Sequence, residues 1–386
     1  MNAELRLGID GDALRLPMSG VGQYVFHLCR ELEALLPDAR FFAYSRLSAQ
    51  RLALPSPRWT LRQEPVPALR RLPSFVWLKT RGAALCAQDR LNVFWAGRSL
   101  HPRLAAPVRT VCTVHDLNHL LAPATMQRST RWSHGLWFEG DLARADCIVA
   151  NSHGTAQRLQ ALLDVSVRGV VHPGVADNFR PTAPQCAHAA REQLSQLGIV
   201  PPYLLSVGTL EPRKNVELLF RAFLDLKWHG ELRGFQLVLA GAKGWRNRDL
   251  ERELAAAGPQ GVVVPGYVPD ALMPALYSAA EALVVPSIYE GFGMPALEAR
   301  ACGTRVVISN VPELCEAAGP RAIVIEPTVQ ALREGILQAL ATPRFETIGI
   351  AERHAWRHSA VRLAAVLTQA APHAAPAPRS STPEAT

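Results

Sequence analysis

The stretch from 283 to 298 reads Leu-Val-Val-Pro-Ser-Ile-Tyr-Glu-Gly-Phe-Gly-Met-Pro-Ala-Leu-Glu. Its apolar beginning predicts a buried strand, and its glycine-rich middle predicts a loop leading into a helix from Met294 or Pro295, where proline is favoured. Gly291 and Gly293 let the backbone come close to a ligand. Because the free N–H groups and the dipole at a helix start favour an anion, the stretch indicates an α/β fold with an anion-binding loop after a strand.

Two carboxylates flank this loop, Glu290 before it and Glu298 inside the helix. Carboxylates accept hydrogen bonds from hydroxyl groups, so the pair suits a ligand that carries a phosphate and several hydroxyls. The alternative is an ordinary helix start with one surface glutamate. The glycines and the position at the carboxyl end of a strand favour the binding interpretation.

The strand-to-helix unit repeats along both halves of the chain, which predicts two Rossmann-like domains with a cleft between them. We expect an N-terminal domain over 1–183, a second domain over 200–345 and a disordered tail over 371–386, and we expect the proline-marked segment 55–73 to interrupt the pattern. The predicted strands lie at 5–9, 41–45, 92–96, 109–114, 147–150, 170–171, 203–207, 235–240, 262–264, 282–285, 305–309 and 322–325.

Composition narrows the class of protein. Hydrophobic residues make up 48% of the 386 and charged residues 19%, as in globular proteins and unlike disordered ones. The seven cysteines are widely spaced without a Cys-x-x-Cys, which favours a reducing cytoplasm over a disulfide framework or a zinc ribbon. No apolar run reaches the roughly 18 residues of a spanning helix, and no signal-peptide pattern opens the chain. We therefore expect a cytoplasmic protein that does not span a membrane.

The net charge of +8 lies entirely in the first half. Residues 1–185 contain 22 basic and 14 acidic side chains, and the rest contain 19 of each. Within 46–109 there are 12 basic residues and two acidic ones. This block predicts contact with something anionic: nucleic acid, anionic lipid or a phosphorylated substrate.

At residues 290–307 the chain resembles the retaining glycosyltransferases of family 4, which have the GT-B fold. The matching residues run from Glu290 to Ala299 and on through Ala301-Cys302-Gly303-Thr304 to Val306-Val307. Arg300 and Arg305 stand where the family usually has Met and Pro. The resemblance implies that Glu290 holds donor-sugar hydroxyls and that Glu298 holds the ribose.

The resemblance extends over most of the chain. Residues 208–215 resemble the family's diphosphate-binding loop, in which Arg213 and Lys214 would meet the leaving group, although Thr209 stands where many members have arginine. His354, Trp356 and Ala360 resemble a C-terminal helix, which we expect over 346–370 and which crosses back to the first domain. The donor contacts that the resemblance implies are Gly20, Gly22, Thr209, Lys243, Tyr267, Val268, Gly291, Phe292, Gly293, Met294, Pro295 and Glu298.

In the first half, Thr113-Val114-His115-Asp116-Leu117 resembles the family's T-x-H-D-L segment. His115 would lie by the donor sugar and act in catalysis with Glu290, Arg213 and Lys214, and Asp116 would lie near the acceptor. The alternative for a lone histidine at the end of an apolar strand is a structural role.

Two patterns resemble metal sites. Asp10-x-Asp12 suggests a divalent-cation motif, but it ends a strand in a chain with a complete metal-independent donor site. His115-Asp116-Leu117-Asn118-His119 suggests a zinc motif, but its first histidine ends a strand. We therefore expect no metal and no cofactor.

The predicted function is retaining transfer of a sugar, of mannose or rhamnose type, from a nucleotide diphosphate sugar in polysaccharide synthesis, with a GDP-sugar favoured. The expected acceptor is lipid-linked or an oligosaccharide. Segment 46–109 mixes cations with aromatic residues, which favours an anionic membrane surface over nucleic acid, so we expect peripheral attachment to the inner face of the cell membrane. A GT-B protein that binds nucleotide sugar without catalysis is the alternative.

Overall fold

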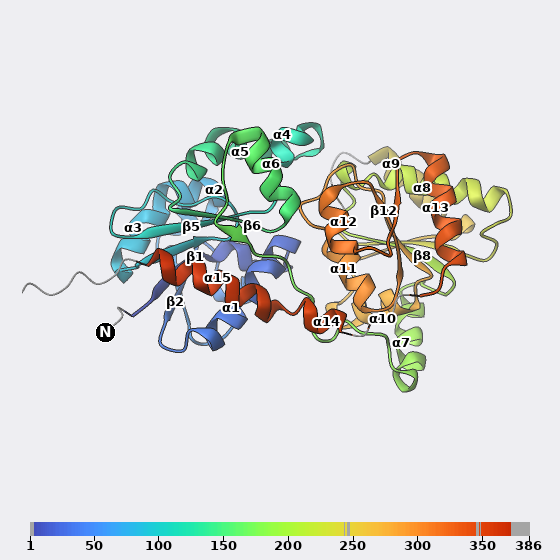
Figure 1. The fold of residues 1–386 in the computed structure, drawn as a ribbon, viewed down its shortest axis with the longest axis horizontal. Coiled ribbons are helices and arrows are strands. Elements are labelled where there is room, and N and C mark those ends of the chain that lie inside the picture. The colour runs from blue at the N-terminus through green and yellow to red at the C-terminus, as the bar shows by residue number, and fades with distance from the viewer. Residues whose placement is uncertain (1–3, 243, 245–247, 345–346, 348, 372–386) are drawn as a thin grey trace, which may run out of the picture. The chain divides into compact units, whose positions relative to one another are not determined.

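The computed structural model describes residues 4–242, 244, 248–344, 347 and 349–371. It contains two parallel sheets, confirming the predicted Rossmann-like pair (Figure 1). The first has the order β3-β2-β1-β4-β5-β6-β7. Its strands are β1 (Arg6–Asp10), β2 (Arg40–Ser45), β3 (Trp59–Gln63), β4 (Val93–Ala96), β5 (Arg109–Val114), β6 (Cys147–Ala150) and β7 (Gly169–Val170).

The second sheet has the order β10-β9-β8-β11-β12-β13, the doubly wound order in which the chain starts in the middle and moves outward twice. All of its strand pairs are parallel, so their carboxyl ends meet at one edge. The strands are β8 (Tyr203–Val207), β9 (Gln236–Ala240), β10 (Val262–Gly266), β11 (Ala282–Val285), β12 (Arg305–Ser309) and β13 (Ile323–Ile325).

Helices alternate with the strands, as the repeated pattern predicts. The longer ones are α1 (Gly20–Leu35), α5 (Arg128–Leu142), α6 (His153–Leu163), α7 (Pro184–Gln196), α8 (Val216–Trp228), α9 (Arg248–Ala256), α11 (Met294–Ala301), α13 (Val329–Ala341) and α15 (Trp356–Ala370). The shorter ones are α2 (Ser74–Trp77), α3 (Ala83–Cys86), α4 (Asn118–Leu121), α10 (Met273–Ala279), α12 (Pro312–Ala318) and α14 (Ile350–Arg353). No helix in the described ranges combines the length and the apolar character needed to cross a bilayer.

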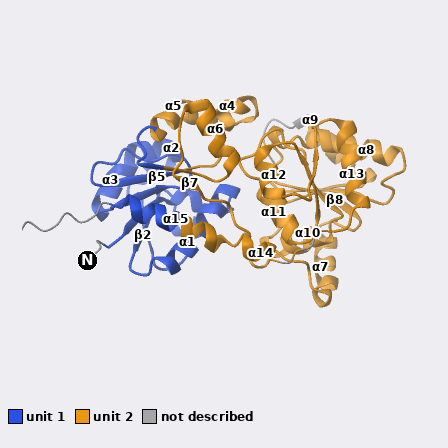
Figure 2. Cartoon of the chain, viewed as in Figure 1, with its two compact units in different colours: residues 1–112, 143–147, 363–386 blue, residues 113–142, 148–362 orange. Residues whose placement is uncertain are grey.

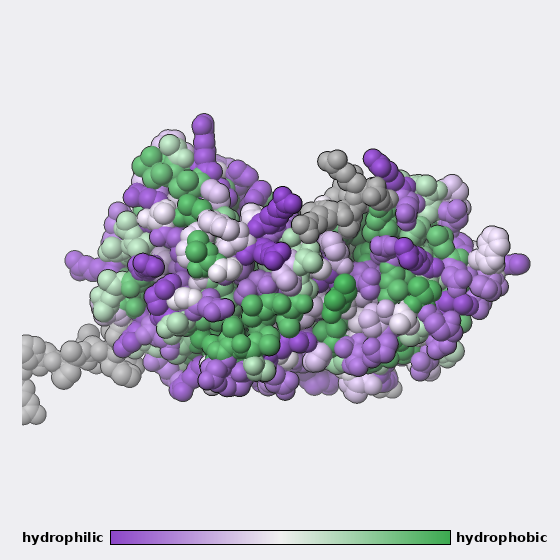
Figure 3. Space-filling model, turned by 90° about the horizontal axis from the view of Figure 1, so that it is seen from above, coloured by the Kyte–Doolittle hydropathy of each residue, from purple (hydrophilic) through white to green (hydrophobic). Residues whose placement is uncertain are grey.

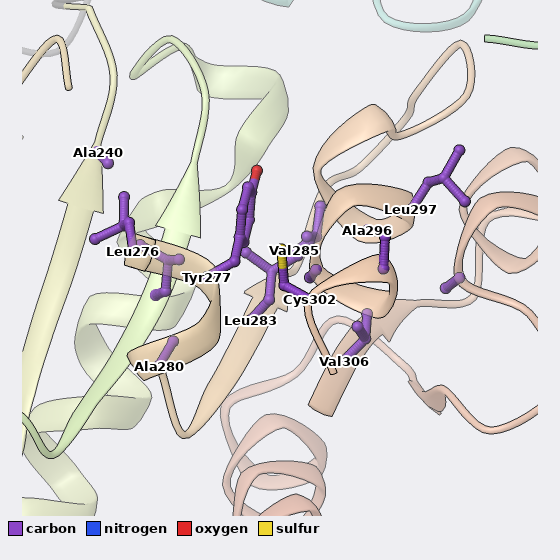
Figure 4. Close-up of a cluster of buried hydrophobic side chains, with 14 of the residues drawn as sticks. Ala240, Leu276, Tyr277, Ala280, Leu283, Val285, Ala296, Leu297, Cys302 and Val306 are labelled. Atoms are coloured by element: carbon purple, nitrogen blue, oxygen red, sulfur yellow. The ribbon is translucent and has the colours of Figure 1, made fainter. Parts of the chain in front are cut away.

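The second sheet is buried on both faces. Leu283 and Val285 of β11 belong to one apolar cluster with α7, α10, α11 and α12, whereas Ala282 and Val284 belong to another with α8, α9 and α13. Alternate side chains of a strand point to opposite faces, so continuous apolar runs give a fully covered parallel sheet. Figure 4 shows Leu283 and Val285 of the first cluster beside Tyr277 and Cys302.

The chain forms two compact units, coloured separately in Figure 2. Unit 1 comprises residues 1–112, 143–147 and 363–386, of which 372–386 lie outside the described residues. Unit 2 comprises residues 113–142 and 148–362. The candidate site residues from Thr113 onward therefore lie in unit 2, and Gly20 and Gly22 lie in unit 1.

The expectation that segment 55–73 interrupts the pattern is wrong, because it contains strand β3. This strand is the first in the sheet order and pairs with β2. Only Trp59 is buried among its five residues, and the others are polar or half-exposed. An edge strand needs little apolar sequence, which explains why the apolar pattern did not predict it.

Candidate functional site

The predicted donor residues of the second half gather where parallel strands of the second sheet end. The loop after β8 contains Thr209, Arg213 and Lys214, and the loop after β11 contains Glu290. Because both strands run in the same direction and are paired side by side, their loops emerge at one edge of the sheet. Ligands of doubly wound sheets bind at this edge.

Glu290 forms the centre of a cluster of buried charges. Its Oε2 accepts a hydrogen bond from Nη1 of Arg213 at 2.5 Å, and its Oε1 accepts one from the ammonium of Lys214. Ser287 also donates to Oε1 at 2.8 Å. Only 5% of Glu290 is exposed, so both cations are held by a carboxylate that water hardly reaches.

The pKa values reflect this pairing. Burial alone would raise the pKa of Glu290, but Arg213 and Lys214 outweigh burial and lower it to about 2. Burial would likewise lower the pKa of Arg213, whereas Glu290, Glu211 and Asp116 raise it. Glu290 and Arg213 are therefore both ionised near neutral pH, and Glu290 also fixes the position of the Lys214 side chain.

The turn between Glu290 and helix α11 depends on its two glycines. A Cβ on Gly291 would lie 2.2 Å from the carbonyl oxygen of His115, and one on Gly293 would lie 2.5 Å from Cδ2 of Leu314. Gly293 also has a φ of +101°, which side-chain-bearing residues rarely adopt. It caps α11, whose first residues are Met294 and Pro295, so the predicted helix start is confirmed.

Glu298 lies inside α11 and accepts a hydrogen bond from the hydroxyl of Tyr277, at 2.7 Å from Oε2. Burial raises the pKa of Glu298 to about 7, and the Tyr277 hydrogen bond opposes that rise. Asp270 raises it further. Unlike Glu290, this carboxyl group titrates near neutral pH.

The segment after β5 lies against the Glu290 loop within unit 2. The hydroxyl of Tyr289 accepts a hydrogen bond from the backbone N–H of Leu117 at 2.8 Å, and the hydroxyl of Ser152 donates to the carbonyl oxygen of Gly291 at 2.9 Å. These contacts and the approach of Gly291 to His115 bring the backbone of His115 and Asp116 to the charge cluster. Asp116 acts electrostatically on Arg213, as its effect on the pKa of Arg213 indicates.

The remaining predicted residues differ in their surroundings. Phe292 and Val268 are buried in the apolar core, so only their backbones are available to a ligand. Tyr267 is 58% exposed and donates a hydrogen bond to Asp270 at 2.8 Å. Thr209 is half-buried, and Lys243 lies outside the described residues.

Gly20 and Gly22 begin helix α1 in unit 1, where the Oγ of Ser19 accepts a hydrogen bond from the N–H of Gly22. A Cβ on Gly22 would lie 2.7 Å from the carbonyl oxygen of Ala13, so packing within the unit requires this glycine. A Cβ on Gly20 would meet nothing within 4 Å. The small size of Gly20 therefore has no explanation in the packing of the described residues.

Three partners of the predicted residues were not expected from the sequence: Ser287, Tyr277 and Glu211. Ser287 lies three residues before Glu290, and that short spacing was a usable signal. Glu211 lies two residues before Arg213, so its pairing with Arg213 could also have been expected from their spacing in the sequence. Tyr277 reaches Glu298 from another helix, and a single sequence contains no signal for that contact.

The residues that depart from the family pattern have structural partners. Arg300 donates to the carbonyl oxygen of Ala317 at 2.8 Å, and Arg305 pairs with Glu281 at 2.9 Å. In Asp10-x-Asp12, Asp10 pairs with Arg98 and Asp12 pairs with Arg46 at 2.8 Å. Both aspartates are buried, so arginines already hold the carboxylates of this metal-like pattern.

Many cations of segment 46–109 also have partners inside unit 1. Arg62 pairs with Asp89 at 2.5 Å and Arg81 with Glu64 at 3.2 Å, and Arg58 donates to backbone carbonyl oxygens. Arg71 and Arg103 are exposed and form no side-chain hydrogen bond or ion pair with any described residue. The block therefore presents fewer available cations than its composition suggests.

Comparison with protein families gives a match to each half of the chain. Residues 18–179 match the model described as Glycosyltransferase Family 4, and residues 191–360 match the model described as Glycosyl transferases group 1. The second match contains the charge cluster and helix α11. The first contains His115 and Asp116.

The chain is 29% identical over 366 residues to the O-antigen chain mannosyltransferase B of Escherichia coli, covering 88% of this chain and 92% of that protein. It is 30% identical over 250 residues to the serotype-specific mannosyltransferase WbdA of Escherichia coli, covering 62% of this chain and 30% of that longer protein. Among solved structures, a sucrose-phosphate synthase from Thermosynechococcus elongatus aligns with a TM-score of 0.74 at 20% identity, covering 95% of this chain and 98% of the synthase. That likeness confirms the GT-B fold.

Proposed function

The chain belongs to the family-4 glycosyltransferases with the GT-B fold, and we propose that it transfers a hexose from a nucleotide diphosphate sugar with retention at the anomeric carbon. The observation that carries the proposal is the buried cluster of Arg213, Lys214 and Glu290 at the carboxyl edge of the second sheet. Two fixed cations next to an anion-favouring helix start suit a leaving diphosphate. They do so without a metal ion.

In this mechanism, bond breaking at the anomeric carbon places negative charge on the diphosphate. Arg213 and Lys214 stabilise that charge more strongly than the charge of the ground-state donor, which lowers the barrier. Glu290 holds both cations in position, and its remaining lone pairs accept donor-sugar hydroxyls. N–H groups from Gly291 to Met294 add donors to the phosphates.

Retention follows in this proposal because the acceptor hydroxyl attacks the anomeric carbon on the face from which the diphosphate leaves. The new C–O bond forms as the C–O bond to the diphosphate breaks, and the hydroxyl proton passes to the departing diphosphate oxygen. A double displacement needs a carboxylate next to the opposite face of the anomeric carbon. We place His115 there, where it lies by the donor sugar and stabilises an oxocarbenium-like state. Asp116 contacts the acceptor.

The nucleoside would bind between Glu298 and Tyr267. The ionised carboxylate of Glu298 accepts the two ribose hydroxyls, and backbone groups at Tyr267 and Val268 contact the base. Thr209 and Lys243 complete the donor contacts. Asp270 is exposed and lies next to Tyr267, and a carboxylate there matches the adjacent N–H donors on one edge of guanine. This chemistry supports a GDP-sugar as donor.

The relatives support the sugar and the acceptor class. Two of them are named mannosyltransferases and one is named for the O-antigen chain, so we propose mannose, or a sugar of rhamnose type, for surface polysaccharide or lipopolysaccharide synthesis. The acceptor would be a lipid-linked or oligosaccharide chain. The protein would work in the cytoplasm, peripherally at the inner face of the cell membrane, with segment 46–109 as one candidate contact.

A panel of GDP-, UDP-, ADP- and dTDP-sugars, each with a lipid-linked mannosyl oligosaccharide, tests the proposal. We expect transfer from GDP-mannose, with the α configuration of the donor kept in the product as read by NMR. Inverted product would overturn retention, and transfer from a different nucleotide only would overturn the base assignment. Tight nucleotide binding without transfer to any acceptor would favour the alternative, a non-catalytic nucleotide-sugar binder.

A further inference from the structure

Helix α5 exposes one continuous face to solvent. Its exposed positions recur at intervals of three and four residues, which is the spacing of one face of a helix. Phe138 and Leu142, on the other side, are buried. The exposed positions are Arg128, Ser129, Arg131, Trp132, Gly135, Leu136, Glu139 and Gly140.

The middle of this face is apolar. Trp132 is 57% exposed and Leu136 is 55% exposed. The neighbouring helix α4 contributes exposed Leu120 and Leu121, and the ring of His119 on α4 packs against Phe138 of α5. Figure 3 views the molecule from the side on which Figure 1 draws α4 and α5, and hydrophobic residues gather there among hydrophilic ones. We call Leu120, Leu121, Arg128, Arg131, Trp132 and Leu136 the α4–α5 surface.

The two arginines of this surface lie at the N-terminal end of α5, where the helix dipole makes a positive charge unfavourable. Arg128 and Arg131 stand in the first turn of α5, where the dipole is positive, and Glu139 stands near its negative end. Within the described residues, neither arginine side chain has a hydrogen bond or an ion pair. By contrast, many arginines of segment 46–109 are paired. The two cations cost helix stability and are free for an external anion.

We propose that the α4–α5 surface docks onto an anionic lipid bilayer. Exposed tryptophan and leucine next to unpaired arginines form the pattern of a helix that lies in a membrane interface, with apolar side chains among acyl chains and cations at headgroup phosphates. The unpaired cations favour an anionic surface over a second copy of this chain, whose matching surface would bring the same arginines together. Moreover, α4 begins at Asn118, directly after Asp116 and Leu117. If the proposed function holds, docking here brings a lipid-linked acceptor to Asp116.

Vesicle sedimentation of the full-length protein tests the proposal without relying on transfer. The vesicles are phosphatidylcholine alone, or phosphatidylcholine mixed with phosphatidylglycerol. We expect binding to the anionic vesicles only, weakened by salt, and about tenfold weaker in Trp132→Ala/Leu136→Ala and in Arg128→Gln/Arg131→Gln. Trp228→Ala, which removes an 88% exposed tryptophan elsewhere, serves as the matched control and keeps full binding.

The variant Arg71→Gln/Arg103→Gln distinguishes the two candidate surfaces, because it removes unpaired cations of segment 46–109. Loss of vesicle binding in this variant, with full binding by the α5 variants, would overturn the proposal in favour of that segment. A concentration-dependent dimer that Trp132→Ala/Leu136→Ala dissociates, without any vesicle binding, would overturn it in favour of a second copy. Far-UV circular dichroism and the melting temperature establish that each variant is folded.

Discussion

At the scale of single residues, Glu298 differs from Glu290 in its protonation. Its pKa of about 7 means that roughly half of the ligand-free molecules are protonated at neutral pH. Ribose hydroxyls donate to the ionised form, so nucleotide binding stabilises that form and releases a proton. We expect calorimetry at neutral pH, in buffers of different ionisation enthalpy, to detect that proton, and affinity to rise with pH through about 7. Glu298→Gln should abolish both effects, and an unchanged proton count in that variant would contradict the assignment.

Tyr277 is a positioning residue for Glu298. Its hydrogen bond lowers the pKa of Glu298, so Tyr277→Phe should move the pH midpoint of nucleotide affinity upward by about one unit, as expected for the loss of a hydrogen bond to a charged group. KM for the donor should rise at neutral pH while kcat changes little. A midpoint that stays in place would show that Tyr277 only packs the core.

Part of the charge cluster around Glu290 could be predicted from the sequence. The sequence placed Arg213 and Lys214 in one strand-end loop and Glu290 in another, because each follows a predicted apolar strand within a few residues. It did not predict that Glu290 pairs with both cations, because that contact joins loops 76 residues apart. The roles of these residues in binding and catalysis stay predictions until the variants are measured.

At the scale of elements, the turn into α11 is held by glycine. Gly293→Ala places a side chain at a φ of +101° and against Leu314, so we expect about 1–3 kcal/mol less unfolding free energy in urea. Gly258→Ala is the matched control, since a Cβ there meets nothing within 4 Å. Equal stability of both variants would contradict the role given to this turn.

Elements with strong apolar runs were predicted to within one or two residues, including β5, β11 and the start of α11. The edge strand β3 was missed because sheet pairing, rather than burial of its own side chains, holds it in place. Strand propensity and the spacing of apolar residues both reflect burial of side chains. They therefore do not predict a strand whose side chains are mostly exposed.

In the whole molecule, the two sheets share the same order over their first six strands, whereas the two halves of the chain differ in net charge. From the sequence alone, we expect the positive excess of the first half to contact an anionic partner. In the structure many basic side chains of this half pair with carboxylates such as Glu64 and Asp89 or donate to carbonyl oxygens, so the number of basic residues overstates the cations that are available to a partner. The neutral second half contains the buried ion-pair cluster of Glu290, Arg213 and Lys214. With the pKa of Glu290 at about 2, we expect activity to be independent of its titration between pH about 5 and 9.

The role of Glu290 in transfer is tested by the initial rate of sugar transfer by wild type, Glu290→Gln and Glu217→Gln under one set of conditions. Glu217 is an exposed glutamate paired with Arg221 on α8, so its variant controls for loss of a surface charge. We predict that Glu290→Gln lowers kcat about 100- to 1000-fold, because Arg213 and Lys214 lose their fixed position and the donor loses a hydroxyl partner. Glu217→Gln should match wild type. A folded Glu290→Gln variant that transfers sugar at the wild-type rate would contradict the role given to Glu290.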